Sequence, residues 1–207
     1  MKPYPDTGDI IWLQTADSTN KEVRRRLESL DNLSIVAAVA QTSGRGQGTH
    51  TWFSRPSSGL TFSMLLRFPS EGAFSLNIKD VLLITEMTTL ALRDYLLPRG
   101  IETRIKWPND IWAGDKKICG ILIENILDAD MVSSSIVGIG LNVNETSWPD
   151  ELPNPVSMRE LTGKEYGLRE ELESLGGEFS KKYALLGSTE GRDSLDREFK
   201  KNMFRLP

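Results

Sequence analysis

A glycine-rich loop and a single arginine stand out as groups that could bind an anion. The segment QTSGRGQG (residues 41–48) follows a predicted strand. Its glycines let backbone N–H groups approach a ligand closely, and Arg45 adds a fixed positive fork, so the loop suits a phosphate or a carboxylate. It is not a P-loop, because the pattern GxxxxGK[ST] is absent. A flexible surface loop with a chance arginine is the alternative interpretation.

A second group places an amide and a carboxylate in adjacent positions. In the pentapeptide KWPND (residues 106–110), Trp-Pro fixes an extended bend at the end of a predicted strand. Asn109 and Asp110 then could hold a ribose, an adenine or a hydrated Mg²⁺, which prefers oxygen ligands. A plain β-turn is the commoner use of Asn-Asp and remains open.

A third group is the run DKKICGILIE (residues 115–124). Lys117 begins an apolar strand, so we expect its ammonium to lie partly inside, whereas Lys116 is expected to be a solvated turn lysine. Gly120 weakens a strand interior unless a ligand or another backbone needs the space. We expect Cys119 to be a small buried apolar side chain.

A fourth group, GIGLNVN (residues 138–144), combines two glycines with Asn142 at a strand end. It could frame a planar group, or it could mark a tight packing of strands.

Composition excludes several other kinds of chemistry. The 207 residues carry a net charge of -4, one histidine (His50) and one cysteine. One chain therefore lacks the roughly four Cys/His ligands of a structural zinc site and cannot form an internal disulfide, which favours a reducing, cytoplasmic location. The acidic balance argues against a nucleic-acid binder. No apolar stretch approaches about 18 residues, and no signal peptide is evident, so we expect no membrane association.

Hydrophobic periodicity predicts the elements that must position these groups. Strands are expected at residues 10–14, 34–42, 60–67, 101–105, 117–127 and 132–143, with a long loop at 44–58. Helices are expected at 20–30, 78–97, 168–186 and, shorter, 195–204, the first with a capping box formed by Thr19 and Glu22. Without strict βαβ alternation, this order favours an α+β fold, a mixed sheet with helices mainly on one face.

Taken in order, these motifs resemble the biotin–protein ligases over about residues 10–160. The series is DSTN (17–20), GRG (44–46), KWPND, K-x-x-GILIE (117–124) and GIGLNVN. KWPND with the downstream lysine separates this family from the lipoate ligases, which share the fold. The resemblance implies a class II synthetase-like catalytic domain that converts biotin and MgATP into biotinyl-5′-AMP and pyrophosphate. It then transfers biotin to a lysine of a biotin carboxyl carrier protein, as in acetyl-CoA carboxylase.

The resemblance also assigns site residues. Lys117 and Arg45 would be catalytic, neutralising the carboxylate and the α-phosphate, and no side chain need act as a covalent nucleophile. The biotin-binding residues implied are Ser18, Thr19, Gln41, Gly44, Arg45, Gln47, Lys117 and Gly120. The ATP- or adenylate-binding residues implied are Arg45, Trp52, Asn109, Asp110, Lys117 and Asn142. No protein-held metal is implied, because Mg²⁺ accompanies the triphosphate.

Three features depart from the family. Its loop often reads GRGRRG or GRGQRG, whereas Gln47 and Gly48 follow Gly46 here and Thr49 stands where a glycine is common. No helix-turn-helix precedes the core, which predicts a monofunctional ligase. Residues 1–190 are expected to be the catalytic domain and 191–207 the start of a C-terminal segment whose usual small β domain is absent.

Two alternatives to the ligase stay open at the level of sequence. One is a module that binds biotin or biotinyl-AMP without turnover, and the other is a lipoate or octanoate ligase. A homodimer joined through sheet edges also stays open, because no such edge can be identified from the sequence.

Overall fold

The computed structural model describes residues 8–48 and 50–204. The strands among them form one mixed sheet of eight strands. The strands are β1 (Ile10–Ala16), β2 (Ile35–Gln41), β3 (Gly59–Arg67), β4 (Arg104–Lys106), β5 (Asp110–Ala113), β6 (Lys116–Asp128), β7 (Met131–Asn142) and β8 (Met203–Phe204). Their order across the sheet is β1-β2-β3-β7-β6-β5-β4-β8, and only the β1–β2 and β4–β8 pairs of these described strands are parallel.

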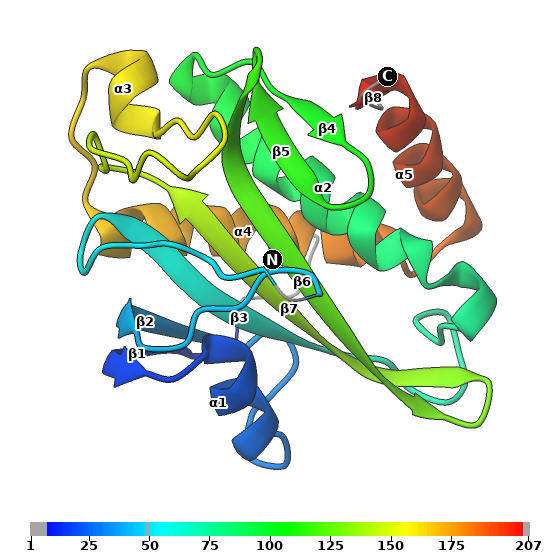
Figure 1. Cartoon of the computed structure of the whole chain (residues 1–207). Helices are drawn as coiled ribbons and strands as arrows, with labels where there is room; N and C mark the ends of the chain where they lie inside the picture. The colour runs from blue at the N-terminus through cyan, green and yellow to red at the C-terminus, as the bar shows by residue number, and fades with distance from the viewer. Residues whose placement is uncertain (1–7, 49, 205–207) are drawn as a thin grey trace.

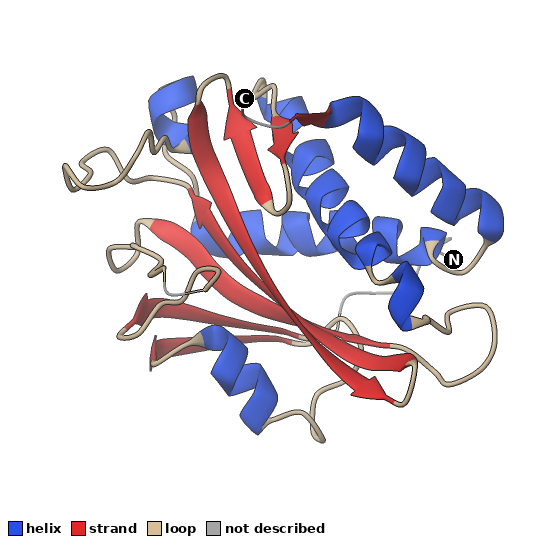
Figure 2. Cartoon of the chain, turned by 45° about the vertical axis from the view of Figure 1, so that its right-hand side comes forward, coloured by secondary structure: helices blue, strands red, loops and turns tan. Residues whose placement is uncertain are grey.

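The helices divide unequally between the two faces of the sheet (Figures 1 and 2). They are α1 (Thr19–Arg25), α2 (Leu82–Leu96), α3 (Met158–Thr162), α4 (Leu168–Leu185) and α5 (Thr189–Asn202), with 3₁₀ turns at Ile78–Asp80 and Leu97–Arg99. Helices α2, α4 and α5 pack together over one face, whereas α1 packs against β2, β3 and β7 on the other. This arrangement confirms the predicted α+β fold with helices mainly on one face.

Alternation along the central strands gives the two faces different characters. On β7, Val137 and Ile139 point into the large core beneath α2, α4 and α5. The residues that alternate with them, Gly138 and Gly140, face the α1 side, because successive residues of a strand point to opposite faces. On β3, Phe62 joins the large core in the same way. On the α1 side of the sheet, the glycines therefore leave space above β7. On the opposite side, the apolar side chains of the large core fill the corresponding space.

Most predicted elements are confirmed, but the start of α1 is not as expected. The helix ends at Arg25, and its N-cap is Ser18, so the predicted Thr19–Glu22 capping box is wrong. Instead, the side-chain oxygen of Gln41 accepts the backbone N–H of Thr19 at 2.8 Å. A helix N-terminus leaves its first N–H groups without partners inside the helix, and here a neighbouring strand supplies the acceptor.

Three elements, β5, α3 and β8, were not expected from the sequence. The strand β5 begins at Asp110, where a turn was the open alternative, and the short helix α3 carries a capping box formed by Ser157 and Glu160. Helix α5 begins at Thr189, earlier than predicted, and Phe199 joins the large core. The domain boundary expected at residue 190 therefore falls inside a helix that packs on the same core as α2 and α4.

No helix in the described part of the chain is both long and apolar enough to cross a membrane.

Helix α2 carries one carboxyl group inside the protein. Glu86 is 2% exposed, and its Oε2 has no hydrogen-bond partner. Burial raises the pKa of Glu86 from 4.5 to about 7, and the nearby Asp196 carboxylate adds to this rise while Lys200 opposes it. The folded protein therefore binds this proton more tightly than the unfolded chain does.

We predict that Glu86→Gln stabilises the protein increasingly as the pH rises. In the wild type the free energy of unfolding falls between about pH 4.5 and pH 7, as the unfolded chain releases the proton first. Denaturant unfolding at pH 5 and pH 8 should show the variant gaining at most about 3 kcal/mol at the higher pH. The exposed Glu173→Gln on α4 serves as control, and an equal effect at both pH values would contradict the prediction.

Candidate functional site

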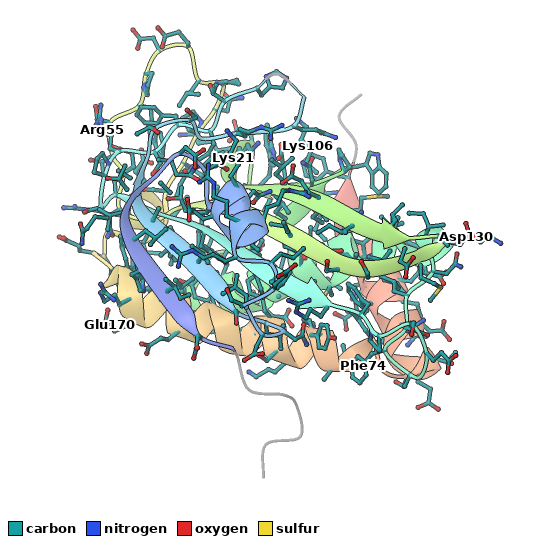
Figure 3. The ribbon with its side chains drawn as sticks, turned by 90° about the horizontal axis from the view of Figure 1, so that it is seen from below. Lys21, Arg55, Phe74, Lys106, Asp130 and Glu170 are labelled. Carbon is teal, nitrogen blue, oxygen red and sulfur yellow. The ribbon has the colours of Figure 1, made fainter. Side chains whose placement is uncertain are left out.

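A cavity of about 370 Å³ opens on the α1 side of the sheet. This volume lies within the range of pockets that hold small molecules. It brings together ten of the residues predicted from the sequence: Ser18, Thr19, Gln41, Arg45, Gln47, Trp52, Asn109, Asp110, Lys117 and Gly120. Figure 3 shows Lys21, Arg55 and Lys106 on this side of the sheet, with Glu170 on the opposite side, near α4.

The floor of the cavity is a row of opposed residues on neighbouring strands. Asp110 pairs with Gly120, and Gly120 with Gly140. A Cβ atom at Gly140 would lie 2.1 Å from the ring of Trp52, and one at Gly120 would lie 2.8 Å from it. The glycines therefore let the indole rest directly on the backbone of the sheet.

A β-bulge aims Lys117 at this floor. Trp112 on β5 pairs with Lys117 and Ile111 with Cys119, so Ile118 is the extra residue on β6. An extra residue shifts the alternation by one position, and Lys117 therefore shares a face with Gly120 rather than the opposite one. Its Nζ lies 2.7 Å from Asp110 Oδ1 and 5.7 Å from the centre of the Trp52 ring. The expectation that this ammonium lies partly inside is confirmed, since its side chain is 32% exposed.

Polar side chains gather at another part of the wall, where α1 meets β2 and β3. Besides its bond to Gln41, Thr19 contacts Ser63, whose Oγ lies 2.7 Å from Thr19 Oγ1. Ser63 also lies 2.6 Å from Asn20 Oδ1, and Asn20 Nδ2 donates to Glu124 Oε2 at 2.9 Å. The same Glu124 faces Arg45 at 3.8 Å.

Three members of this network, Asn20, Ser63 and Glu124, were not among the predicted site residues. Glu124 gave the clearest signal, because it is the one charged residue in the otherwise uncharged run from Ile118 to Leu127 and lies an even number of residues after Gly120. The period of two would have placed both on one face. Ser63 gave little signal, since a serine in an apolar strand does not by itself indicate a partner.

Two predicted residues lie elsewhere. Gly44 accepts the backbone N–H of Trp52 at 3.1 Å within the loop and is not among the residues that line the cavity. Asn142 lines a second, adjoining cavity of about 200 Å³ together with Phe53, Trp148 and Pro155. The amide of Asn142 donates to the carbonyl oxygen of Val156 at 3.0 Å. Trp52 and Lys117 line both cavities and so form the wall between them.

Other predicted residues have structural partners within the site. Asn109 Nδ2 donates to the carbonyl oxygen of Ile121 at 2.6 Å, which fixes the KWPND segment against β6. Arg45 and Thr51 form an isolated β-bridge that closes the glycine-rich loop, and Thr49 lies outside the described residues.

The chemistry available is that of ion pairs and hydrogen bonds. Cys119 is fully buried, as expected, and burial raises the pKa of its thiol, so it is no nucleophile. His50 is an exposed loop residue at the cavity margin. Within residues 8–48 and 50–204, no three His, Cys, Asp or Glu side chains are grouped to hold a metal ion.

Comparison with known proteins gives consistent similarities. The model of the biotin/lipoate A/B protein ligase family matches residues 12–144. A bifunctional ligase/repressor BirA from Bacillus spizizenii is 34% identical over 161 residues, which cover 75% of this chain and 47% of that protein. A biotin–[acetyl-CoA-carboxylase] ligase from Paracoccus denitrificans is 32% identical over 182 residues, covering 84% and 72%. This chain thus spans about half the length of the first relative.

A solved structure extends the similarity to three dimensions. The biotin protein ligase of Aquifex aeolicus in complex with biotin and ATP superposes with a TM-score of 0.75 at 27% identity. The match covers 95% of this chain and 78% of that one.

We predict that Gly140→Ala drives the indole of Trp52 off the sheet, because the new methyl group would occupy the position of the ring. Acrylamide should then quench tryptophan fluorescence more strongly than in the wild type. The difference should vanish in a Trp52→Leu background. As a control, Gly177→Ala on α4 meets no atom within 4 Å and should only stabilise the helix, by at most about 1 kcal/mol. Unchanged quenching in folded Gly140→Ala would contradict the prediction.

Proposed function

Because this chain belongs to the biotin/lipoate A/B protein ligase family, we propose that it is an ATP-dependent biotin–protein ligase. Biotin and ATP give biotinyl-5′-AMP and pyrophosphate, and biotin then passes to a lysine of a biotin carboxyl carrier protein. The relatives' names support this substrate and this type of acceptor.

The observation that carries the proposal is the position of Lys117 in the wall shared by two adjoining cavities. The larger cavity has the polar end at Thr19 and Gln41, and the smaller has the aromatic rings of Phe53 and Trp148, which suit an adenine. A carboxylate from the first cavity and an α-phosphate from the second would meet at the Lys117 ammonium.

The first step joins two anions. An oxygen of the biotin carboxylate attacks the α-phosphorus, the bond to the bridging oxygen of pyrophosphate breaks, and pyrophosphate leaves with the bonding electrons. Repulsion between the reactants opposes their approach, and a cation held in a cavity offsets it more than it would in open water. Lys117 and Arg45 supply that charge without forming a covalent intermediate.

The second step transfers the acyl group. The amine of the carrier lysine attacks the carbonyl carbon of the mixed anhydride, a proton leaves the nitrogen, and AMP departs. Arg45, Gly46 and Gln47 line the cavity, and a β-bridge joins Arg45 to Thr51 beside Trp52. A loop in this position would protect the anhydride from water.

Mg²⁺ belongs to the proposal as the counter-ion of the triphosphate. Asp110 is the cavity carboxylate that fits this role, because Mg²⁺ in nucleotide sites takes one or two carboxylates and completes its shell with phosphate oxygens and water. When bound, the ion would add positive charge beside the phosphates. A cytoplasmic location belongs to the proposal as well, and a homodimer is not needed for it.

Incubation with biotin, MgATP and an apo carrier domain tests the function. We expect pyrophosphate release and a mass gain of one biotin on the carrier. Tight biotin binding without pyrophosphate release would favour a binding module instead. Adenylation of lipoate in preference to biotin, measured in competition, would indicate a lipoate ligase.

Lys117→Ala should lower the rate of adenylation by about 100- to 1,000-fold, the usual cost of removing one preorganised charge stabiliser. The control is Lys116→Ala, one residue away, where the exposed lysine is the first residue of β6, beside the turn at 114–115, and should keep the wild-type rate. A Lys117→Ala variant that retains the wild-type rate would rule out the role given to this residue.

A further inference from the structure

A chain of hydrogen bonds runs from Glu124 to the wall of the larger cavity. Asn20 Nδ2 donates to Glu124 Oε2 at 2.9 Å, and Ser63 Oγ lies 2.6 Å from Asn20 Oδ1 and 2.7 Å from Thr19 Oγ1. Thr19 and Asn20 are each 4% exposed and Ser63 is fully buried, so bulk water does not compete for the bonds at Ser63, whereas the side chain of Glu124 is 27% exposed. Gly138 makes room for the chain, since a Cβ there would lie 2.1 Å from Asn20 Oδ1.

The hydrogen bonds of this series can have only one assignment of donors and acceptors. An ionised carboxylate accepts hydrogen bonds and donates none, so the amide nitrogen of Asn20 must face Glu124. The amide oxygen then faces Ser63 and can only accept, so Ser63 must donate its single hydroxyl proton to it. The Ser63 oxygen is left to accept the hydroxyl proton of Thr19. Thr19 therefore turns the lone pairs of its oxygen, and not its proton, toward the cavity.

Gln41 presents hydrogen-bond donors beside the acceptor oxygen of Thr19. Its side-chain oxygen accepts the backbone N–H of Thr19 at 2.8 Å, which leaves the amide N–H groups as the donors that Gln41 has to offer. Both residues line the same cavity. An acceptor next to a donor is the complement of a ligand group –NH–C(=O)–.

We propose that Glu124 is a positioning residue that determines specificity: through Asn20 and Ser63 it fixes Thr19 as a hydrogen-bond acceptor. The cavity then selects acids whose head group is a cyclic urea or amide over acids with no N–H. This inference rests on the proposed function, in which biotin supplies the cyclic urea and lipoate, with its dithiolane ring, supplies no N–H donor.

We call the hydrogen-bond series from Glu124 through Asn20 and Ser63 to Thr19 the relay. Calorimetric titration with biotin tests it in four proteins: wild type, Thr19→Val, Glu124→Leu and the double variant. Each single substitution should weaken biotin binding by about ten- to a hundredfold, the effect of leaving a buried polar group without its partner. The double variant should bind no more weakly than Thr19→Val, because Glu124 acts only through Thr19. Weak binding of lipoate should not change in Glu124→Leu.

Two further variants separate the relay from other effects of Glu124. Glu124→Gln keeps an oxygen for Asn20 but loses the charge that faces Arg45, so it should restore biotin affinity to within about threefold of the wild type. Asp128→Asn, an exposed change on the same strand, should have no effect. If Glu124→Leu does not fold, Ser63→Ala breaks the hydrogen-bond series directly beside Thr19 and should give the same loss.

The outcomes are distinct. Additive losses in the double variant, or wild-type affinity in folded Glu124→Leu, would overturn the relay while leaving the ligase function in place. A wild-type protein that binds no biotin would instead reject the proposed function, and the relay would fall with it.

Discussion

The site depends above all on the absence of side chains at one point of the sheet. Gly120 and Gly140 oppose each other on β6 and β7, so the backbone itself forms the floor. The indole of Trp52 occupies the space that two Cβ atoms would take, and it divides the two cavities. Lys117 extends over the same floor, because the bulge at Ile118 turns it there. A Cβ atom at either glycine would displace the indole, and one at Gly120 would also lie 3.2 Å from the Lys117 ammonium.

The charged side chains of the site form two ion pairs, and an anionic ligand can bind to the cation of each pair. Lys117 faces Asp110 and Arg45 faces Glu124 across the cavity wall. All four groups keep some contact with solvent, so neither pair is locked by burial and each contributes little to stability. A protein with a net charge of -4 can thus hold cations for a carboxylate and a polyphosphate without a basic surface.

Periodicity predicted most of the fold because burial on a strand or a helix leaves a regular pattern. It failed where an element is short or where its partner is remote. The strand β5 has only four residues, and β8 has two, so neither shows a period of its own. The capping box predicted at Thr19 failed because Gln41, more than twenty residues later, supplies the acceptor instead. Local sequence cannot report a hydrogen bond that closes only when two strands and a helix have packed.

The sequence by itself determined which side chains are available: the loop arginine, Lys117 near the start of β6, the amide and carboxylate of KWPND, and the strand glycines. It also determined the mixed sheet on which they lie. The tertiary structure decided which of them meet. The bulge at Ile118 directs Lys117 to Asp110, and the approach of α1 to β3 and β6 joins Thr19 to Glu124. Both outcomes depend on register between strands, which is set by packing over the whole sheet and not by any one segment.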